Sequence, residues 1–250
     1  MSKKSVISRI GGHVRDYLLR RFPLAMHSSS GIEVALRNRN EIRLYEQIFV
    51  ENLYKLYELE KTFKVVNPVI FDVGANCGFF SIHALDIWPG ARVHAFEPQR
   101  LVFHEFKKAI SLNNLSDQIQ CANIAVGKND GKANFYENRS QISASLVKNK
   151  VARRRITNKY FVNVLSLDSY INFNNIVGID ILKVDVEGGE LDVLEGARQA
   201  LNIVSILLIE VHPPFASADM VEAIVRKYGF SRAREFEGNL NQDIDLVFVK

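Results

Sequence analysis

The sequence predicts an α/β fold, a mostly parallel sheet with helices on both faces, and three observations carry this prediction. From residue 69 onward, short apolar runs alternate with amphipathic stretches, which is typical of strand–helix–strand units with right-handed crossovers. The run IDILKVDVEGG is nearly continuous in its apolar character, as in a strand with two buried faces. A chain of 250 residues that is 47% hydrophobic also has enough apolar side chains for a full core.

The first 66 residues are expected to form a helical extension of the domain at residues 67–250. Residues 5–22 place apolar side chains at helical spacing, with arginines on the other faces. This basic helix either docks on the body of the protein or rests on a membrane surface, and we favour docking. Residues 41–63 show the pattern of one long amphipathic helix that ends near Asn67-Pro68. The expected apolar stripe of the first helix is Val6, Ile10, Val14, Tyr17 and Leu18.

The other elements are expected in a regular order along the chain. PVIFDVG is the first strand of the sheet, a helix follows as far as the Pro89-Gly90 turn, and ARVHAFEP is the second strand. RLVFHEFKKAISLNN is the second helix, DQIQCANIAVG is the third strand, and Asp130-Gly131 marks a hairpin turn. ELDVLEGARQAL is expected to be one helix before the buried strand VSILLIEVHPP. A helix through Tyr228 and a final strand pair, GFSRAREFE and DIDLVFVK, complete the domain.

Charge and composition exclude several classes of protein. The net charge of +4 comes from two basic segments, residues 1–21 and 148–159, whereas the rest of the chain is acidic. This distribution argues against a nucleic-acid-binding surface. No apolar run approaches the roughly 20 residues of a membrane span, and the N-terminus has no signal-peptide pattern. Cys77 and Cys121 are expected to be reduced thiols, so the expected location is cytoplasmic.

The stretch FDVGANCGFF joins the first strand to the first helix and indicates a cofactor site. Gly74 and Gly78 permit positive φ and a close approach of a ligand to the backbone. Glu97 ends the next strand about twenty residues later, where an acid accepts hydrogen bonds from a ribose diol. Asn76 stands where dinucleotide loops have glycine, which disfavours a pyrophosphate and favours S-adenosylmethionine (SAM). Asp72 is expected to face the SAM ammonium group, and Asn76 its methionyl end.

Several motifs, in their order and spacing, give the chain a family resemblance. FDVGANCGFFS, AFEP, VLSLDSY, IDILKVDVEGGELDVLEG and LLIEVH resemble the FkbM family of SAM-dependent methyltransferases. The resemblance covers Val69 to about His212 and implies the class I methyltransferase fold, a Rossmann-like sheet of seven strands with the last strand antiparallel. It also implies O-methylation of a sugar, glycan or secondary-metabolite hydroxyl. The cofactor residues that it implies are Asp72, Gly74, Ala75, Asn76 and Gly78 in the turn, Glu97 for the ribose and Asn123 for the adenine edge.

A second cluster of polar residues ends two buried strands that should be neighbours in the sheet. KVDVEGGE carries Asp185 and Glu187, and IEVHPP carries Glu210 and His212. In the first interpretation, Asp185 faces cofactor and acceptor, and Asp185 or His212 takes the hydroxyl proton. In the second, the carboxylates and His212 hold a divalent cation. In the third, Glu187 only caps the next helix and His212 is a structural histidine. We favour the first, with Asp185, Glu187 and His212 as catalytic candidates, and assign no metal ligand.

The sequence constrains the acceptor substrate less than the cofactor, and two alternative functions stay open. The basic segment VKNKVARRRITNK is either a solvated loop or a guide for an acidic or lipid-linked acceptor, with Ser143 and Ser145 beside it. A nicotinamide-dependent oxidoreductase is an alternative, because Tyr57 and Lys61 form a Tyr-x-x-x-Lys pattern. However, that pattern precedes the glycine turn. A catalytically inactive SAM-binding protein is the other alternative.

Overall fold

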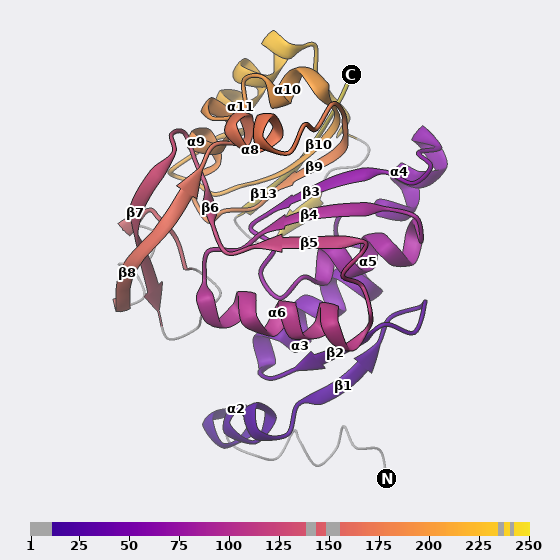
Figure 1. The fold of residues 1–250 in the computed structure, drawn as a ribbon, viewed down its shortest axis with the longest axis vertical. Coiled ribbons are helices and arrows are strands. Elements are labelled where there is room, and N and C mark those ends of the chain that lie inside the picture. Colours follow the sequence, from indigo (N-terminus) through magenta and orange to yellow (C-terminus); the bar gives the residue numbers. More distant parts are fainter. Residues whose placement is uncertain (1–11, 139–143, 149–155, 235–237, 241–242) are drawn as a thin grey trace.

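The computed structural model describes residues 12–138, 144–148, 156–234, 238–240 and 243–250. Their centre is an eight-stranded sheet in which seven strands follow one another in the order β11-β13-β10-β9-β3-β4-β5, and β12 pairs with β13 (Figure 1). The strands are β3 (Val69–Val73), β4 (Arg92–Phe96), β5 (Ile119–Ala122), β9 (Ile179–Val184), β10 (Val204–Val211), β11 (Ser231–Arg232), β12 (Gly238–Leu240) and β13 (Asp243–Val249).

The sheet is parallel except at its C-terminal strands. The five strands from β5 through β4, β3 and β9 to β10 pair in parallel, and β13 pairs with β10 in the antiparallel sense. The chain enters the sheet at β3, runs outward to β5, and then returns to place β9 on the other side of β3. The strand order therefore reverses between β3 and β9. The predicted fold class, including the antiparallel last strand, is confirmed.

Helices cover both faces of the sheet (Figure 1). One face carries α5 (Phe79–Ile87) and α6 (Arg100–Leu112), and the other carries α8 (Leu167–Phe173), α9 (Glu190–Glu195), α10 (Ala200–Ile203) and α11 (Ala218–Val225). Successive residues of a strand belong to different apolar cores, since Ile70 packs on one side and Phe71 on the other. Two buried faces explain the nearly continuous apolar strands. Among the described helices, none has the length and apolar character that a membrane span requires.

The N-terminal segment differs from the prediction of helices alone. After α2 (Gly12–Arg21), strands β1 (Leu24–His27) and β2 (Glu33–Leu36) form an antiparallel hairpin. The expected long helix is also wrong, because α3 (Arg39–Tyr45) passes into a π-helical turn at Glu46–Val50 and a new helix, α4, begins at Leu56 and ends at Phe63. Asn52, with φ of 51°, causes the break, since its side chain accepts a hydrogen bond from the Leu56 N–H at 3.1 Å.

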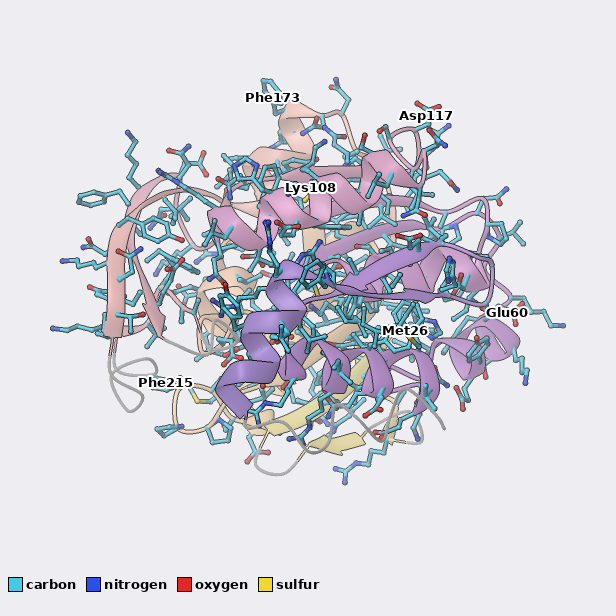
Figure 2. The ribbon with its side chains drawn as sticks, turned by 90° about the horizontal axis from the view of Figure 1, so that it is seen from below. Met26, Glu60, Lys108, Asp117, Phe173 and Phe215 are labelled. Atoms are coloured by element: carbon cyan, nitrogen blue, oxygen red, sulfur yellow. The ribbon has the colours of Figure 1, made fainter. Side chains whose placement is uncertain are left out.

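The N-terminal segment docks on the body, as favoured, but through a different side of α2. Leu19 is buried, whereas Tyr17 and Leu18 of the expected stripe are 71% and 39% exposed. Val6 and Ile10 of that stripe lie outside the described residues. Asp16 also pairs with Arg39, its Oδ1 lying 3.4 Å from Nε. Figure 2, seen from below, shows the N-terminal segment with Met26 labelled, beside α6 with Lys108 labelled. β2 contacts α6, so this segment forms a further layer over one face of the sheet.

A small second sheet follows the large one and corrects two expectations. Strands β6 (Ala125–Val126), β7 (Gly131–Asn138) and β8 (Ile156–Leu165) pair in the order β6-β8-β7. Asp130-Gly131 does begin β7, but the strands that flank it do not pair with each other, because β8 lies between them. The hairpin prediction is therefore wrong. The expected third strand is in fact two strands, because β5 belongs to the large sheet and β6 to the small one.

The helix expected over residues 190–201 is also interrupted. Helix α9 ends at Glu195, and α10 begins at Ala200. Gly196 separates them, and a Cβ atom at this position would lie 2.2 Å from the Gly127 carbonyl oxygen. The close approach of the Gly127 loop, which leads out of β6, thus coincides with the end of the helix.

Gly78 provides a test of this packing. Its φ is +81°, and an added Cβ would lie 2.0 Å from the Phe106 ring of α6. We expect Gly78→Ala to lower the free energy of unfolding by about 2–4 kcal/mol, because it combines backbone strain with overpacking. Gly178→Ala is the matched control, since nothing lies within 4 Å of its added Cβ. Urea unfolding measures both, and equal midpoints for the two variants would contradict the packing role of Gly78.

Candidate active site

The turn after β3 lies directly against the segment that follows β9. Gly74 has a φ of +79°, and a Cβ atom there would lie 1.8 Å from the Asp185 carbonyl oxygen. The N–H groups of Gly74 and Ala75 both donate to the Phe96 carbonyl at 3.0 Å, which ties the turn to the end of β4 as well. Only glycine fits this conformation and this approach. The turn therefore lies where the strand order reverses, which is where open α/β sheets bind ligands.

Glu97 is joined to the same turn through the backbone. Its Oε2 accepts the Asn76 N–H at 2.8 Å, and its Oε1 accepts the Gln99 N–H at 2.7 Å. Burial raises the pKa of Glu97 to about 7, although the two N–H donors oppose this shift. Each carboxylate oxygen accepts about two hydrogen bonds. The side chain thus retains one acceptor position on each oxygen, as a pair of ribose hydroxyls requires.

A cavity of about 420 Å³ opens beside these residues and lies within the size range of small-molecule sites. Six of the predicted site residues line it. They are Gly74, Ala75, Asn76, Glu97, Asp185 and Glu187. The structure therefore brings the turn after β3, the acid after β4 and the acids after β9 to one cavity, which is the arrangement that the sequence analysis expected.

The other four predicted residues lie behind the cavity wall. Asp72 is fully buried and accepts a hydrogen bond from Ser81 Oγ at 2.7 Å. Asn123 donates its side-chain N–H groups to the Glu97 and Pro98 carbonyls at 2.8 and 3.1 Å. His212 is buried too, with 1% of its surface exposed, and Gly78 packs against Phe106. These four residues support the parts of the chain that line the cavity.

Lys183 is an important residue to which the sequence analysis gave no role. Its Nζ donates to the Gly74 carbonyl at 2.9 Å and lies 3.2 Å from Asp72 Oδ1 and 3.6 Å from Asp185 Oδ2. Burial alone would lower the pKa of Lys183, but the carboxylates of Asp72 and Asp185 raise it above the usual value. Its signal in the sequence is a lysine inside the apolar run IDILKVDVEGG.

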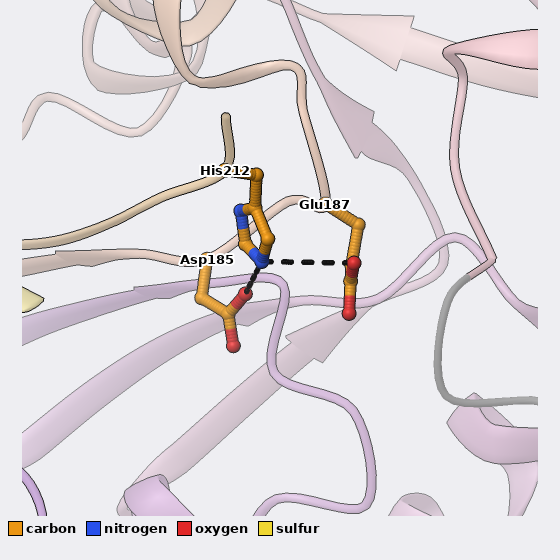
Figure 3. Close-up of side chains that lie close together, drawn as sticks. All are labelled: Asp185, Glu187 and His212. Atoms are coloured by element: carbon orange, nitrogen blue, oxygen red, sulfur yellow. Dashed lines mark ion pairs between the residues drawn. The ribbon is translucent and has the colours of Figure 1, made fainter. Parts of the chain in front are cut away.

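His212 is the centre of the second cluster (Figure 3). Its Nε2 lies 4.0 Å from Asp185 Oδ1, 3.6 Å from Glu187 Oε2 and 3.6 Å from Glu210 Oε1. Its Nδ1 contacts Oε1 of Glu190, a fully buried acid that the sequence analysis missed, at 2.7 Å. Burial opposes the charged ring, but Glu190 and the acids on the other side raise the pKa of His212 to about 9. The predicted convergence at this strand edge is present.

The wall opposite the sheet comes from the N-terminal segment, which the sequence analysis did not connect with the site. Asn38, Glu41, Arg43 and Tyr54 line the cavity from α3 and its flanking turns. The pattern of these residues indicates an amphipathic helix but not the surface that it covers.

One of the serines beside the basic segment contacts the wall of the cavity. Ser145 is buried and donates its hydroxyl to the Glu187 carbonyl at 2.9 Å, so it supports the wall of the cavity. Ser143 and residues 149–155, which include Arg153, Arg154 and Arg155, lie outside the described residues.

Comparison with known proteins identifies the family. The Methyltransferase FkbM domain model matches residues 72–232. The chain belongs to the FkbM methyltransferase family. This FkbM-family protein is a SAM-dependent methyltransferase, and the resemblance noted in the motifs is confirmed. Tyr57 and Lys61, the basis of the oxidoreductase alternative, lie on α4 and do not line the cavity.

Two curated relatives match over most of their length. One is the 31-O-demethyl-FK506 methyltransferase FkbM of Streptomyces tacrolimicus, 27% identical over 234 residues, which cover 82% of this chain and 88% of the relative. The other is the hexuronic acid methyltransferase AglP of Haloferax volcanii, 25% identical over 181 residues, which cover 72% of this chain and 70% of the relative. Both are methyltransferases by name, as the family assignment requires.

Solved methyltransferases share the fold. Methyltransferase FkbM from Methylobacillus flagellatus KT aligns with a TM-score of 0.52 and 16% identity, over 74% of this chain and 44% of that one. Magnesium protoporphyrin IX methyltransferase (ChlM) from Synechocystis PCC 6803, solved with bound SAM, aligns with a TM-score of 0.51 and 13% identity. That alignment covers 99% of this chain and 96% of ChlM. The likeness shows the fold of the FkbM-family chain.

Removal of the Lys183 charge tests how this site is held together. We expect Lys183→Met to lower the free energy of unfolding by about 3–5 kcal/mol, because it leaves the buried Asp72 carboxylate without its counter-charge. Asp72→Asn in the same chain should recover part of that loss. A double-mutant cycle by urea unfolding measures the coupling. Additive effects of the two substitutions would mean that the pair does not act as a unit.

Proposed function

We propose that this FkbM-family methyltransferase transfers the methyl group of SAM to a hydroxyl group of a small molecule or sugar. The observation that carries the proposal is the cavity that has Glu97 on one side and Asp185 with Glu187 on another. In the reaction, the acceptor oxygen forms a bond to the methyl carbon as the carbon–sulfur bond breaks. The electron pair of that bond stays on sulfur, which yields S-adenosylhomocysteine. The hydroxyl proton passes to a carboxylate.

The cofactor is proposed to lie along the ends of β3 and β4. Glu97 accepts hydrogen bonds from the ribose hydroxyls, and the turn Gly74–Asn76 holds the methionyl end. Gly74 lets this turn lie directly against the Asp185 carbonyl. Asp72, Gly78 and Asn123 act through the backbone that they support, since they do not line the cavity. This arrangement places the sulfonium toward Asp185, whose negative charge suits a cationic methyl donor.

Asp185 is the proposed proton acceptor. It lines the cavity together with Glu187, whereas His212 lies behind them with 1% of its side chain exposed. A general base must come within hydrogen-bond reach of the proton that it removes. Asp185 meets that requirement because it lines the cavity. His212 and Glu187 instead position the groups around Asp185. Alignment of oxygen, methyl carbon and sulfur supplies most of the rate enhancement, because the sulfonium is already activated.

The proposed acceptor class follows the names of the relatives and the charges of the wall. FkbM acts on a demethylated FK506 and AglP on a hexuronic acid, so both a metabolite and an acidic sugar are represented. Among the described lining residues, carboxylates predominate over cations, which favours a neutral acceptor unless a cation accompanies it. The lining acids are Glu41, Glu97, Asp185, Glu187, Asp192 and Glu210, and the lining cations are Arg43 and Lys183. That the basic segment 148–159 guides an acidic or lipid-linked acceptor stays a hypothesis.

Transfer of a labelled methyl group tests the function and the role of Asp185 together. The protein is incubated with methyl-labelled SAM and a host extract, and the labelled product is identified. We expect Asp185→Asn to slow labelling about 10²–10⁴-fold, while calorimetry gives a SAM affinity within about threefold of the wild type. Absence of any labelled product with a protein that binds SAM would indicate the catalytically inactive alternative. Full activity of Asp185→Asn would remove Asp185 as the base.

The pKa of Glu97 predicts how SAM binding depends on pH. The ribose contact needs the carboxylate, and the free protein holds the Glu97 pKa at about 7. Protonation below this value therefore competes with SAM, so affinity rises with pH through about 7 and then levels. We expect binding to be roughly tenfold weaker near pH 6 than near pH 8. Calorimetry measures this, with Glu97→Gln as the control that binds weakly at both values. A parallel pH dependence in Glu97→Gln would assign the effect to another group.

A further inference from the structure

The side chains at the inner end of the cavity have the geometry of metal ligands. One oxygen each of Asp185 and Glu187 and one nitrogen of His212 lie within 4.8 Å of one another. Figure 3 shows both carboxylates directed toward Nε2 of the ring. The separations of 3.6–4.0 Å between Nε2 and the two carboxylates exceed a hydrogen bond. A cation with bonds of about 2.1 Å holds its ligand atoms roughly 3.0–3.5 Å apart, so a contraction of the widest separation by about 1–2 Å completes the site.

The orientation of His212 is a second and independent observation. Nδ1 contacts Glu190 Oε1 at 2.7 Å, and this carboxylate also accepts the Gly188 N–H at 2.8 Å. Glu190 is fully buried and is not one of the three candidate ligands. Metal-binding histidines almost always donate their other ring N–H to a carboxylate or carbonyl, which fixes the ring. With Nδ1 engaged in this way, Nε2 is the nitrogen that faces the acids and the cavity.

The charges of the cluster also favour a bound cation. Asp185, Glu187, Glu190 and Glu210 surround one imidazole, and Lys183 divides its charge between Asp72 and Asp185. Oε2 of Glu190 is buried and has no hydrogen bond within the part of the chain that the structure describes. Carboxylates in such surroundings cost several kcal/mol each unless a positive charge compensates them. A divalent ion would supply that charge in place of the proton that the His212 ring otherwise carries.

The cluster is open toward the cavity on one side. Asp185, Glu187 and Glu210 line the cavity, and His212 closes the site from behind. An ion bound between these side chains would have protein ligands on the side of His212 and open coordination positions on the side of the cavity. This is the arrangement of a catalytic rather than a structural metal centre.

We propose that Asp185, Glu187 and His212 bind a divalent cation such as Mn²⁺, with Glu190 as the residue that positions the histidine. One imidazole nitrogen with carboxylate oxygens suits a transition-metal ion better than Ca²⁺ or Mg²⁺, which prefer oxygen alone. The role of the ion rests on the proposed function. It coordinates the acceptor oxygen and makes the hydroxyl proton easier to remove. Asp185 Oδ1 faces His212, so coordination through it leaves Oδ2, which lies 3.6 Å from Lys183 Nζ, as the oxygen that accepts the proton.

Titration of Mn²⁺ into EDTA-treated protein, followed by electron paramagnetic resonance, tests the site without an acceptor. We expect one saturable Mn²⁺ per chain and a nitrogen coupling from the imidazole in pulsed spectra. Glu187→Gln and His212→Gln should each weaken binding by about tenfold or more, and His212→Gln should also remove the nitrogen coupling. Asp192→Asn is the matched control, because it removes an acid that lines the same cavity outside the cluster. Its Mn²⁺ affinity should equal that of the wild type.

Several outcomes would overturn the metal site. They are a wild-type protein that binds no Mn²⁺ up to millimolar concentrations, binding without a nitrogen coupling, and unchanged binding by both cluster variants. Calorimetry with SAM shows that each variant is folded. Methyl transfer that persists in EDTA-treated protein without bound Mn²⁺ would reject the catalytic ion and leave the proposed function intact. Mn²⁺ binding by a protein that neither binds SAM nor transfers methyl groups would retain the metal site and reject the proposed function.

Discussion

One buried ammonium group holds the ends of two neighbouring strands together, and the cavity depends on that contact. Lys183 of β9 reaches the Gly74 carbonyl and the carboxylates of Asp72 and Asp185. An unpaired carboxylate as buried as Asp72 would cost several kcal/mol, so the lysine, the acid and the turn form one unit. Because the turn also binds Glu97 through the Asn76 N–H, the position of the ribose acid depends on the same unit.

The elements that follow from local sequence are the ones that the sequence analysis located correctly. Strands β3, β9 and β10 carry apolar side chains to both faces of the large sheet, which produces the nearly continuous apolar runs in the sequence. The N-terminal hairpin and the β6-β8-β7 sheet were not found. The β6-β8 pairing joins residues far apart in the chain, such as Val126 with Leu165. The N-terminal hairpin pairs nearby residues, such as His27 with Glu33, but each of its strands has only four residues, which is a short pattern to find. Likewise, Asp130-Gly131 indicates a turn but does not specify which strands pair beside it.

In the site too, residues that a local pattern marks were predicted, whereas roles that depend on packing between distant elements were not. A glycine or an acid at a strand end is visible in the sequence, and four predicted residues of this kind line the cavity, namely Gly74, Glu97, Asp185 and Glu187. The sequence could not show which side chains face the cavity and which support it from behind. Asp72 belongs to the second group because its side chain is buried against Ser81 and Lys183. Glu190 and the wall from the N-terminal segment were missed because their roles arise only from contacts across elements.

The acids around His212 are difficult to explain by stability alone. Replacement of a buried ionic cluster by apolar side chains of similar volume is often neutral or stabilising, so a chain under selection for folding alone has little reason to keep one. Here the cluster lies at the reversal of strand order, beside the cavity and next to the turn that Lys183 holds. The negative electrostatic field of these acids stabilises a cationic sulfonium and the positive charge that develops on the acceptor oxygen during methyl transfer. The cost of these buried charges is therefore best understood as part of the chemistry of methyl transfer.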